Sequence, residues 1–179
     1  MLKMSNMGFF KDELQYIRAF VFDVDGVFTN GMIYVSGKGT QSRAMNVKDG
    51  YAVHYASKIG YPIGIISGGR CESVTYRFND LGVEDVFLSS HNKMKDFETF
   101  LAKYNLSPQD VLYVGDDLPD YPVMKKVRIS VCPADAAQEI QSIAHYISPF
   151  KGGQGCVRDI LEQTLKSQGK WMNKEAFVW

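Results

Sequence analysis

Short apolar runs alternate along the chain with longer amphipathic segments. The runs are rich in Val, Ile, Tyr and Phe, and they cover residues 19–24, 61–66, 85–88, 111–114, 127–131 and 145–147. Between them the spacing predicts helices near 50–59, 71–80, 94–104, 119–126, 135–142 and 155–166. Strands that alternate with helices predict an α/β fold with a Rossmann-like, doubly wound parallel sheet covered by helices on both faces.

One segment interrupts this alternation directly after the first predicted strand. Residues 31–46 indicate two short strands around Gly37, Lys38 and Gly39, which is typical of a β-hairpin. The stretch from Asp25 to Ser67 has room for this hairpin and one helix. We therefore expect a β-hairpin insertion and no separate cap domain.

Length and composition favour one globular domain over residues 1–179, with a core at about 18–166 and a C-terminal tail at 167–179. The apolar end of this tail is expected to dock, either on this chain or on another subunit. Lys plus Arg and Asp plus Glu are 20 each, which excludes a strongly basic nucleic-acid binder. No apolar stretch is long enough for a membrane helix, and residues 1–18 lack the features of a signal peptide. Three widely spaced cysteines form no disulfide framework, so we expect reduced thiols and a cytoplasmic location.

Chemically reactive residues follow several of the predicted strands. Open parallel sheets bind ligands beyond the carboxyl ends of their strands. The segments at these ends are FDVDG at 22–26, SGG at 67–69 and GDD at 115–117, and Lys93 opens the helix after the third strand. We expect these acids, the hydroxyl and the amine to meet at one edge of the sheet.

Asp23 and Asp25 lie two residues apart, so both side chains point the same way in an extended segment. Neighbouring carboxylates repel each other, and a hard cation relieves that repulsion. A third carboxylate from Asp116 or Asp117 would complete a site for Mg²⁺, which binds carboxylates, waters and phosphate oxygens. A lone D-x-D is weak evidence, since it also occurs in metal-dependent glycosyltransferases and in plain turns, but its combination with GDD is stronger.

Other signals are weaker when each is taken alone. Ser67, Gly68 and Gly69 offer a hydroxyl and free N–H groups to an anion, although Gly-Gly also simply makes a tight turn. Lys93 is also compatible with a solvent-exposed lysine at the start of a helix. Lys151 begins the segment KGGQG, which could bind an anion or could simply be a loop before a helix.

Two further groups of residues are interpreted as unrelated to the chemistry. Cys71 and Arg77 have the C-x5-R spacing of cysteine phosphatases, but the residues between them include no glycine and have a helical pattern. Cys71 is therefore interpreted as an ordinary thiol. The three histidines show no ligand spacing and are interpreted as structural or surface groups.

The segments FDVDGVFT (22–29), IISG (65–68), Lys93 and GDDLPD (115–120) occur in the order of the four motifs of the haloacid dehalogenase superfamily, and the chain resembles its phosphatases. More narrowly, residues 18 to about 170 resemble the 3-deoxy-D-manno-octulosonate 8-phosphate phosphatases. The segments that carry this likeness are DGVFTNGMIY (25–34), NVKDGYAV (46–53), GDDLPDYPVM (115–124) and GGQGCVRD (152–159).

The resemblance implies Mg²⁺-dependent hydrolysis of a small sugar-acid phosphate through an aspartyl phosphate, in the synthesis of a lipopolysaccharide precursor. Asp23 matches the nucleophile and Asp25 the general acid/base. Ser67 and Lys93 match the groups that bind phosphate. The metal ligands implied are Asp23, Asp116 and the backbone carbonyl of Asp25, with Asp117 and Asp120 in supporting positions.

The sequence departs from the family where substrate contacts are expected. Gly69 stands where many relatives have an arginine, and Gln154 replaces another. We expect Gly68 and Gly69 to line the substrate site. The carboxylate of a 2-keto acid needs a cation, for which the candidates are Arg70, Lys151 and Arg158. The substrate stays open between 3-deoxy-D-manno-octulosonate 8-phosphate, 2-keto-3-deoxynononate 9-phosphate and another small phosphate.

An uncapped site would be open to water, whereas a selective phosphatase needs an enclosed one. We therefore expect a neighbouring subunit to close it, with the 31–46 hairpin assembling the homotetramer that the resemblance implies. Two other classes of protein fit the sequence less well. A response-regulator receiver places its phosphorylated aspartate after the acidic pair, which is the opposite of the order here. A non-catalytic module of the same fold would not need the intact acids at 23, 25 and 116.

Overall fold

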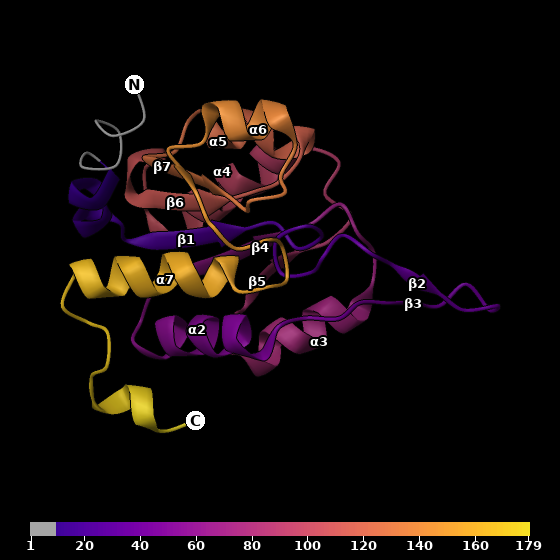
Figure 1. Cartoon of the computed structure of the whole chain (residues 1–179), viewed down its shortest axis with the longest axis horizontal. Helices are drawn as coiled ribbons and strands as arrows, with labels where there is room; N and C mark the ends of the chain where they lie inside the picture. The colour runs from indigo at the N-terminus through magenta and orange to yellow at the C-terminus, as the bar shows by residue number, and fades with distance from the viewer. Residues whose placement is uncertain (1–9) are drawn as a thin grey trace.

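The computed structural model describes residues 10–179, in which a parallel sheet of six strands forms the centre (Figure 1). Its strand order is β5-β4-β1-β6-β7-β8. The strands are β1 (Ala19–Phe22), β4 (Ile63–Ile66), β5 (Asp85–Phe87), β6 (Val111–Val114), β7 (Ile129–Cys132) and β8 (Tyr146–Ile147). The α/β prediction is confirmed. Strand β6 coincides with its predicted run, whereas the other strands are shorter than theirs. Strand β1 ends at Phe22, so that Asp23 follows it directly.

Helices cover both faces of this sheet (Figure 1). One layer contains α2 (Val47–Lys58), α3 (Glu72–Asp80) and α7 (Cys156–Ser167), and the other contains α4 (Lys93–Tyr104), α5 (Tyr121–Met124) and α6 (Gln138–Ile143). The alternation along β1 shows how the strands serve both layers, because Phe20 and Phe22 pack in one core and Ala19 and Val21 in the other. Residues buried on both faces explain why the strands are continuously apolar.

The connection after β6 differs from the single helix expected near 119–126. It consists of the 3-10 turn η3 (Leu118–Asp120) followed by the short helix α5. Asp117 caps this turn by accepting a hydrogen bond from the Leu118 N–H group at 2.8 Å. The described part of the chain contains three more 3-10 turns, η1 (Leu14–Tyr16), η2 (Pro108–Asp110) and η4 (Lys174–Phe177).

The predicted hairpin is present as β2 (Tyr34–Val35) and β3 (Gln41–Ser42), which pair antiparallel and project away from the sheet (Figure 1). Tyr34 and Val35 are 61% and 66% exposed. The hairpin is therefore an arm rather than a part of the core.

The C-terminal tail lies against α2 of its own chain (Figure 1). Lys58 donates to the Val178 carbonyl oxygen at 2.7 Å, and the ring of Trp179 stacks on that of His54 with centroids 4.9 Å apart. The apolar end of the chain thus has a site on its own protomer, while Trp179 stays largely exposed.

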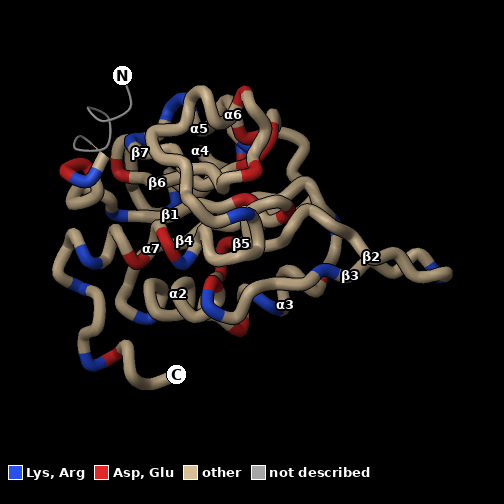
Figure 2. The backbone as a smooth tube through the Cα atoms, viewed as in Figure 1, with Lys and Arg blue, Asp and Glu red and all other residues tan. Residues whose placement is uncertain are grey.

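Charges of both signs are spread over the helices and loops (Figure 2). Among residues 10–179, no helix has the length and apolar character needed to span a membrane. The expectation about an N-terminal signal peptide concerns in part residues 1–9, which lie outside the described residues.

Candidate active site

Polar residues follow the C-terminal ends of three adjacent strands, β4, β1 and β6. Ser67 and Asp23 directly follow β4 and β1, and Asp116 follows β6 after one glycine. The chain crosses from one side of β1 to the other between β4 and β6, which is the position where doubly wound sheets bind ligands.

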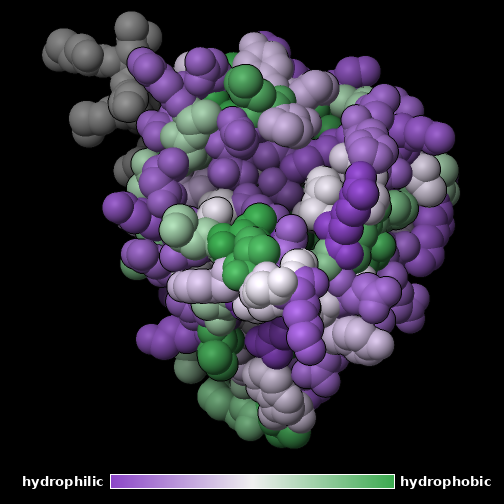
Figure 3. Space-filling view, turned by 90° about the vertical axis from the view of Figure 1, so that its right-hand side faces the viewer, coloured by the Kyte–Doolittle hydropathy of each residue, from purple (hydrophilic) through white to green (hydrophobic). Residues whose placement is uncertain are grey.

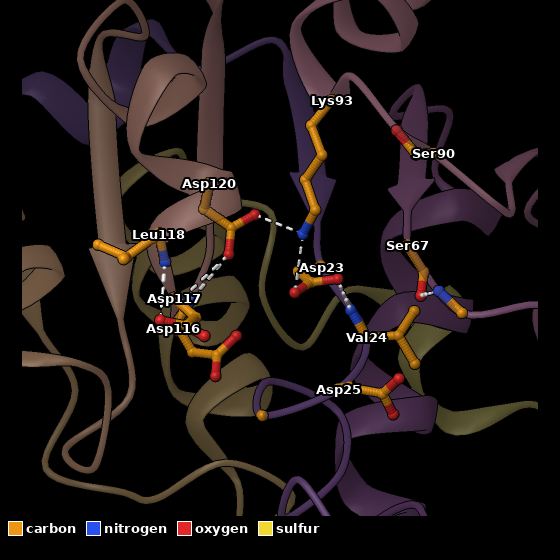
Figure 4. A network of polar contacts seen from close by, with 12 residues as sticks. Asp23, Val24, Asp25, Ser67, Ser90, Lys93, Asp116, Asp117, Leu118 and Asp120 are labelled. Carbon is orange, nitrogen blue, oxygen red and sulfur yellow. Dashed lines mark hydrogen bonds and ion pairs between the residues drawn. The ribbon is translucent and has the colours of Figure 1, made fainter.

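A pocket of about 340 Å³ opens at these strand ends, and we call it the strand-end pocket. Its lining combines carboxylates, two serines, one lysine and a backbone rich in glycine. The residues are Asp23, Asp25, Gly26, Gly31, Ser67, Gly68, Gly69, Ser90, Lys93, Asp116, Asp117 and Pro119. The expected convergence of acids, hydroxyl and amine is therefore present in the tertiary structure (Figure 4).

Lys93 is a buried cation between two carboxylates. Its Nζ atom lies 2.9 Å from Oδ2 of Asp23 and 2.7 Å from Oδ1 of Asp120 (Figure 4). The other oxygen of Asp23, Oδ1, accepts a hydrogen bond from the N–H group of Val24 at 2.7 Å. Asp23 is thus held at both oxygens and faces the pocket.

Asp120 is fully buried and acts as a hub beneath the pocket. Its Oδ1 also accepts from the Tyr113 hydroxyl at 2.6 Å, and its Oδ2 accepts from the N–H group of Asp116 at 3.0 Å. Both oxygens therefore have partners within the protein. Asp120 consequently orients Lys93 and the backbone of Asp116 rather than offering a free oxygen to a metal ion.

Oxygens of Asp23, Asp116 and Asp120, which we call the acidic cluster, lie within 4.8 Å of one another. The Oδ1 atom of Asp116 is buried and has no hydrogen-bond partner within residues 10–179. A Cβ atom at Gly26 would lie 2.0 Å from Oδ2 of Asp116, so the glycine leaves the space that this carboxylate occupies. An unpaired buried oxygen beside a second carboxylate fits a divalent metal ion.

Without a cation, the acidic cluster favours bound protons. Burial, with a further contribution from the charge of Asp120, raises the pKa of Asp116 to about 7. Burial and the same neighbour also raise the pKa of Asp23, although Lys93 opposes this shift. For Lys93, burial favours a lower pKa, but the charges of Asp23 and Asp120 outweigh it and raise the pKa. A divalent cation would take over the charge compensation that protons provide here.

Asp25 lines the same pocket, but its carboxylate is not part of the acidic cluster. It accepts two hydrogen bonds from Arg43, from Nε to Oδ1 at 2.6 Å and from Nη2 to Oδ2 at 3.0 Å. Its side chain is therefore engaged with Arg43, and the role of its backbone carbonyl as a metal ligand stays a prediction.

Ser67, Gly68 and Gly69 form the wall of the pocket opposite the acidic cluster (Figure 4). The N–H group of Gly69 donates to Oγ of Ser67 at 3.0 Å, which orients the buried hydroxyl. The bend therefore presents a hydroxyl and an accessible backbone to an anion.

The three cations expected near a substrate carboxylate do not line the strand-end pocket of this protomer. Arg70 and Lys151 are exposed. The guanidinium of Arg158 lies over the Trp171 ring, 4.6 Å from its centroid, and its Nε donates to Glu162 at 2.8 Å. Their role at a substrate carboxylate stays a prediction.

Arg43 and Tyr113 were not anticipated from the sequence. Arg43 lies in the predicted hairpin segment, where no local pattern distinguishes it from a surface arginine. Tyr113 lies within the apolar run 111–114, where its spacing does not distinguish it from the neighbouring apolar residues, and its hydroxyl meets Asp120 only after folding. Cys71 lies at the start of α3 outside the strand-end pocket, with its Sγ atom 3.0 Å from Oγ of Ser73.

Comparisons with known proteins show the family of this chain. A family model described as haloacid dehalogenase-like hydrolase matches residues 70–160. The 3-deoxy-D-manno-octulosonate 8-phosphate phosphatase of Escherichia coli K12 is 39% identical over 154 residues, which cover 86% of this chain and 82% of that protein.

Solved structures that are similar to this chain include enzymes of the same name. The enzyme of that name from Yersinia pestis has a TM-score of 0.87 and 36% identity, covering 89% of this chain and 86% of its own. The Moraxella catarrhalis enzyme, solved with a magnesium ion, a phosphate ion and KDO, has a TM-score of 0.89 and 26% identity, covering 92% and 95%. The order of the strand-end motifs, the pocket and these relatives lead to one conclusion: the chain belongs to the haloacid dehalogenase-like hydrolases and is a phosphatase.

Proposed function

We propose that this phosphatase hydrolyses a small sugar-acid phosphate, 3-deoxy-D-manno-octulosonate 8-phosphate, to the free sugar acid and phosphate. The observation that carries the proposal is the placement of Asp23 against Lys93 at 2.9 Å in a pocket that also contains Ser67 and Asp25. The identity of the relatives supports this substrate. In that role the protein makes a lipopolysaccharide precursor in the cytoplasm.

The metal we propose is Mg²⁺, which is present in the Moraxella catarrhalis relative. The residues that would hold it are Asp23 and Asp116 through their carboxylates and Asp25 through its backbone carbonyl. When bound, Mg²⁺ supplies positive charge that lowers the repulsion between an anionic nucleophile and an anionic phosphate.

The reaction divides into two displacements at phosphorus. A carboxylate oxygen of Asp23 attacks, the bond from phosphorus to the sugar oxygen breaks, and Asp25 gives its proton to that oxygen. Asp25 then takes a proton from water as the water oxygen bonds to phosphorus and the bond to Asp23 breaks. Lys93 and Ser67 hold the phosphate oxygens in both steps.

The decisive experiment measures phosphate release from a panel of sugar-acid phosphates with and without Mg²⁺. The panel includes 2-keto-3-deoxynononate 9-phosphate, which separates the proposed substrate from its nearest competitor. Asp23→Asn is expected to lower turnover by several orders of magnitude because the nucleophile is lost. Near-normal release by this variant, with mass spectrometry excluding deamidation, would contradict the assignment.

We also propose a homotetramer assembled through the hairpin. Apolar side chains on the hairpin are exposed in the protomer, among them Tyr34 and Val35, and hydrophobic groups are visible at the hairpin end of the surface (Figure 3). Such an arm buries apolar area when it meets other copies. A neighbouring copy would also close the open pocket. Sedimentation showing a fully active monomer would contradict this.

A further inference from the structure

The side chain of Arg43 is buried at the base of an exposed arm. Arg43 directly follows β3 of the hairpin, yet only 3% of its side chain is exposed. Its Nε and Nη2 atoms donate to the two oxygens of Asp25 at 2.6 and 3.0 Å. This parallel pair of hydrogen bonds fixes the plane of the carboxylate as well as its distance.

The surroundings of Arg43 connect this contact to the pocket wall. A Cβ atom at Gly69 would lie 3.1 Å from Nη2 of Arg43, 3.2 Å from Oγ of Ser67 and 3.4 Å from Oδ2 of Asp25. Three functional groups therefore meet at a point that the glycine leaves free. The Nη1 atom of Arg43 is buried and has no hydrogen-bond partner among the described residues. The guanidinium therefore forms its ion pair with Asp25.

We infer that Arg43 is a positioning residue for catalysis, which holds the Asp25 carboxylate at the leaving-group side of the pocket. This inference rests on the proposed function, in which Asp25 protonates the sugar oxygen. Because the Arg43 guanidinium comes from the hairpin segment, this segment takes part in catalysis as well as in any assembly of subunits.

A purely structural role for the ion pair makes a different prediction. If Arg43 only anchored the hairpin, its loss would affect all substrates alike or only stability. A positioning role affects the step that needs the proton. A sugar alkoxide is a poor leaving group and needs this proton, whereas p-nitrophenolate is a good one and leaves without it.

The experiment compares four variants on two substrates. The variants are Arg43→Met, Arg43→Lys, Asp25→Asn and the double variant that combines Arg43→Met with Asp25→Asn. The substrates are 3-deoxy-D-manno-octulosonate 8-phosphate and p-nitrophenyl phosphate, the latter followed as the rapid first release of nitrophenolate. For Arg43→Met, kcat on the sugar phosphate is expected to fall about 100-fold, while the first release of nitrophenolate changes only a few-fold. Arg43→Lys should recover part of the loss, since it restores the charge but not the fork.

The double variant should be no slower than Asp25→Asn alone, because both changes remove the same function. Arg18→Met is the matched control, since Arg18 pairs with Asp110 at 3.4 Å on the surface, and its activity should equal that of the unchanged protein. Thermal unfolding of every variant identifies losses caused by instability, and Arg43→Lys keeps the test valid if Arg43→Met does not fold.

The outcomes separate the inference from the proposed function. If Asp25→Asn shows the leaving-group dependence and neither folded Arg43 variant does, the positioning role is wrong and the proposed function stands. If Asp25→Asn shows no such dependence, Asp25 is not the acid, and the inference falls with that assignment. Additive losses in the double variant would also overturn the inference.

Discussion

Lys93 and Asp120 form an ion pair of 2.7 Å in which 5% and 0% of the side chains are exposed. Lys93 opens α4 and Asp120 ends η3, so the pair joins two elements on the same side of the sheet. Since the same Nζ atom lies 2.9 Å from Asp23, Asp120 holds the cation against the proposed nucleophile.

Asp120→Asn should therefore impair catalysis without removing any group that lines the pocket. The amide keeps the shape but loses the charge that holds Lys93, and kcat is expected to fall roughly 10- to 100-fold. Steady-state kinetics with the sugar phosphate measure this, and KM should change less than kcat. Asp80→Asn is the control, because Asp80 is a surface acid whose side chain is 76% exposed. Equal kinetics for the two variants would contradict the role given to Asp120.

Gly26→Ala should displace the Asp116 carboxylate. The new Cβ atom would lie 2.0 Å from Oδ2 of Asp116, and φ at Gly26 is +85°. We expect affinity for Mg²⁺ to fall about 10- to 100-fold, as when a group that orients a metal ligand is lost. Calorimetric titration with Mg²⁺ measures the effect.

Gly60→Ala separates backbone strain from displacement. Gly60 also has a positive φ, but nothing lies within 4 Å of the added Cβ atom. This variant should lose about 1–2 kcal/mol of stability through strain alone and keep its affinity for Mg²⁺. Parallel losses of affinity in both variants would show that strain, not the carboxylate, is responsible.

Binding of Mg²⁺ should weaken as the pH falls below about 7, the raised pKa of Asp116 in the metal-free protein. Below that pH the carboxylate holds a proton that must leave before the metal binds, so the apparent affinity drops up to about tenfold per pH unit. Above that pH the Asp116 carboxylate is ionised, and its own contribution to the pH dependence of the affinity levels off. Calorimetry in buffers of different ionisation enthalpy counts the protons released, and the absence of release near the pKa would contradict this expectation.

Asp49 should stabilise the protein by capping a helix other than its own. It is buried in α2, and its oxygens accept from the N–H groups of Arg158 at 2.7 Å and Gly155 at 3.2 Å at the start of α7. The N-cap residue Gly155 offers no side chain for this purpose. Asp49→Ala should cost about 1–2 kcal/mol in the free energy of unfolding, measured by denaturant titration. The exposed helical acid Glu98 serves as the control, since Glu98→Ala removes no such bond.

Local patterns along the chain were enough to predict the layers of the fold and the strand ends at which the reactive residues lie. Short continuous apolar runs rich in Val, Ile, Tyr and Phe that alternate with amphipathic segments are typical of strands buried on both faces. The positions of Asp23, Ser67 and Asp116 after β1, β4 and β6 therefore follow from local pattern. Motif order then identified the family, because each motif is a short contiguous segment.

Which side chains meet depends on how the elements pack in three dimensions. Arg43 reaches Asp25, Tyr113 reaches Asp120, and Asp49 caps α7, and none of these pairs is marked by periodicity or spacing. A hydrogen bond depends on distance and direction in space, which are established only when the elements pack. For the same reason the sequence could name Arg158 as a cation for the substrate, while packing places its guanidinium over Trp171.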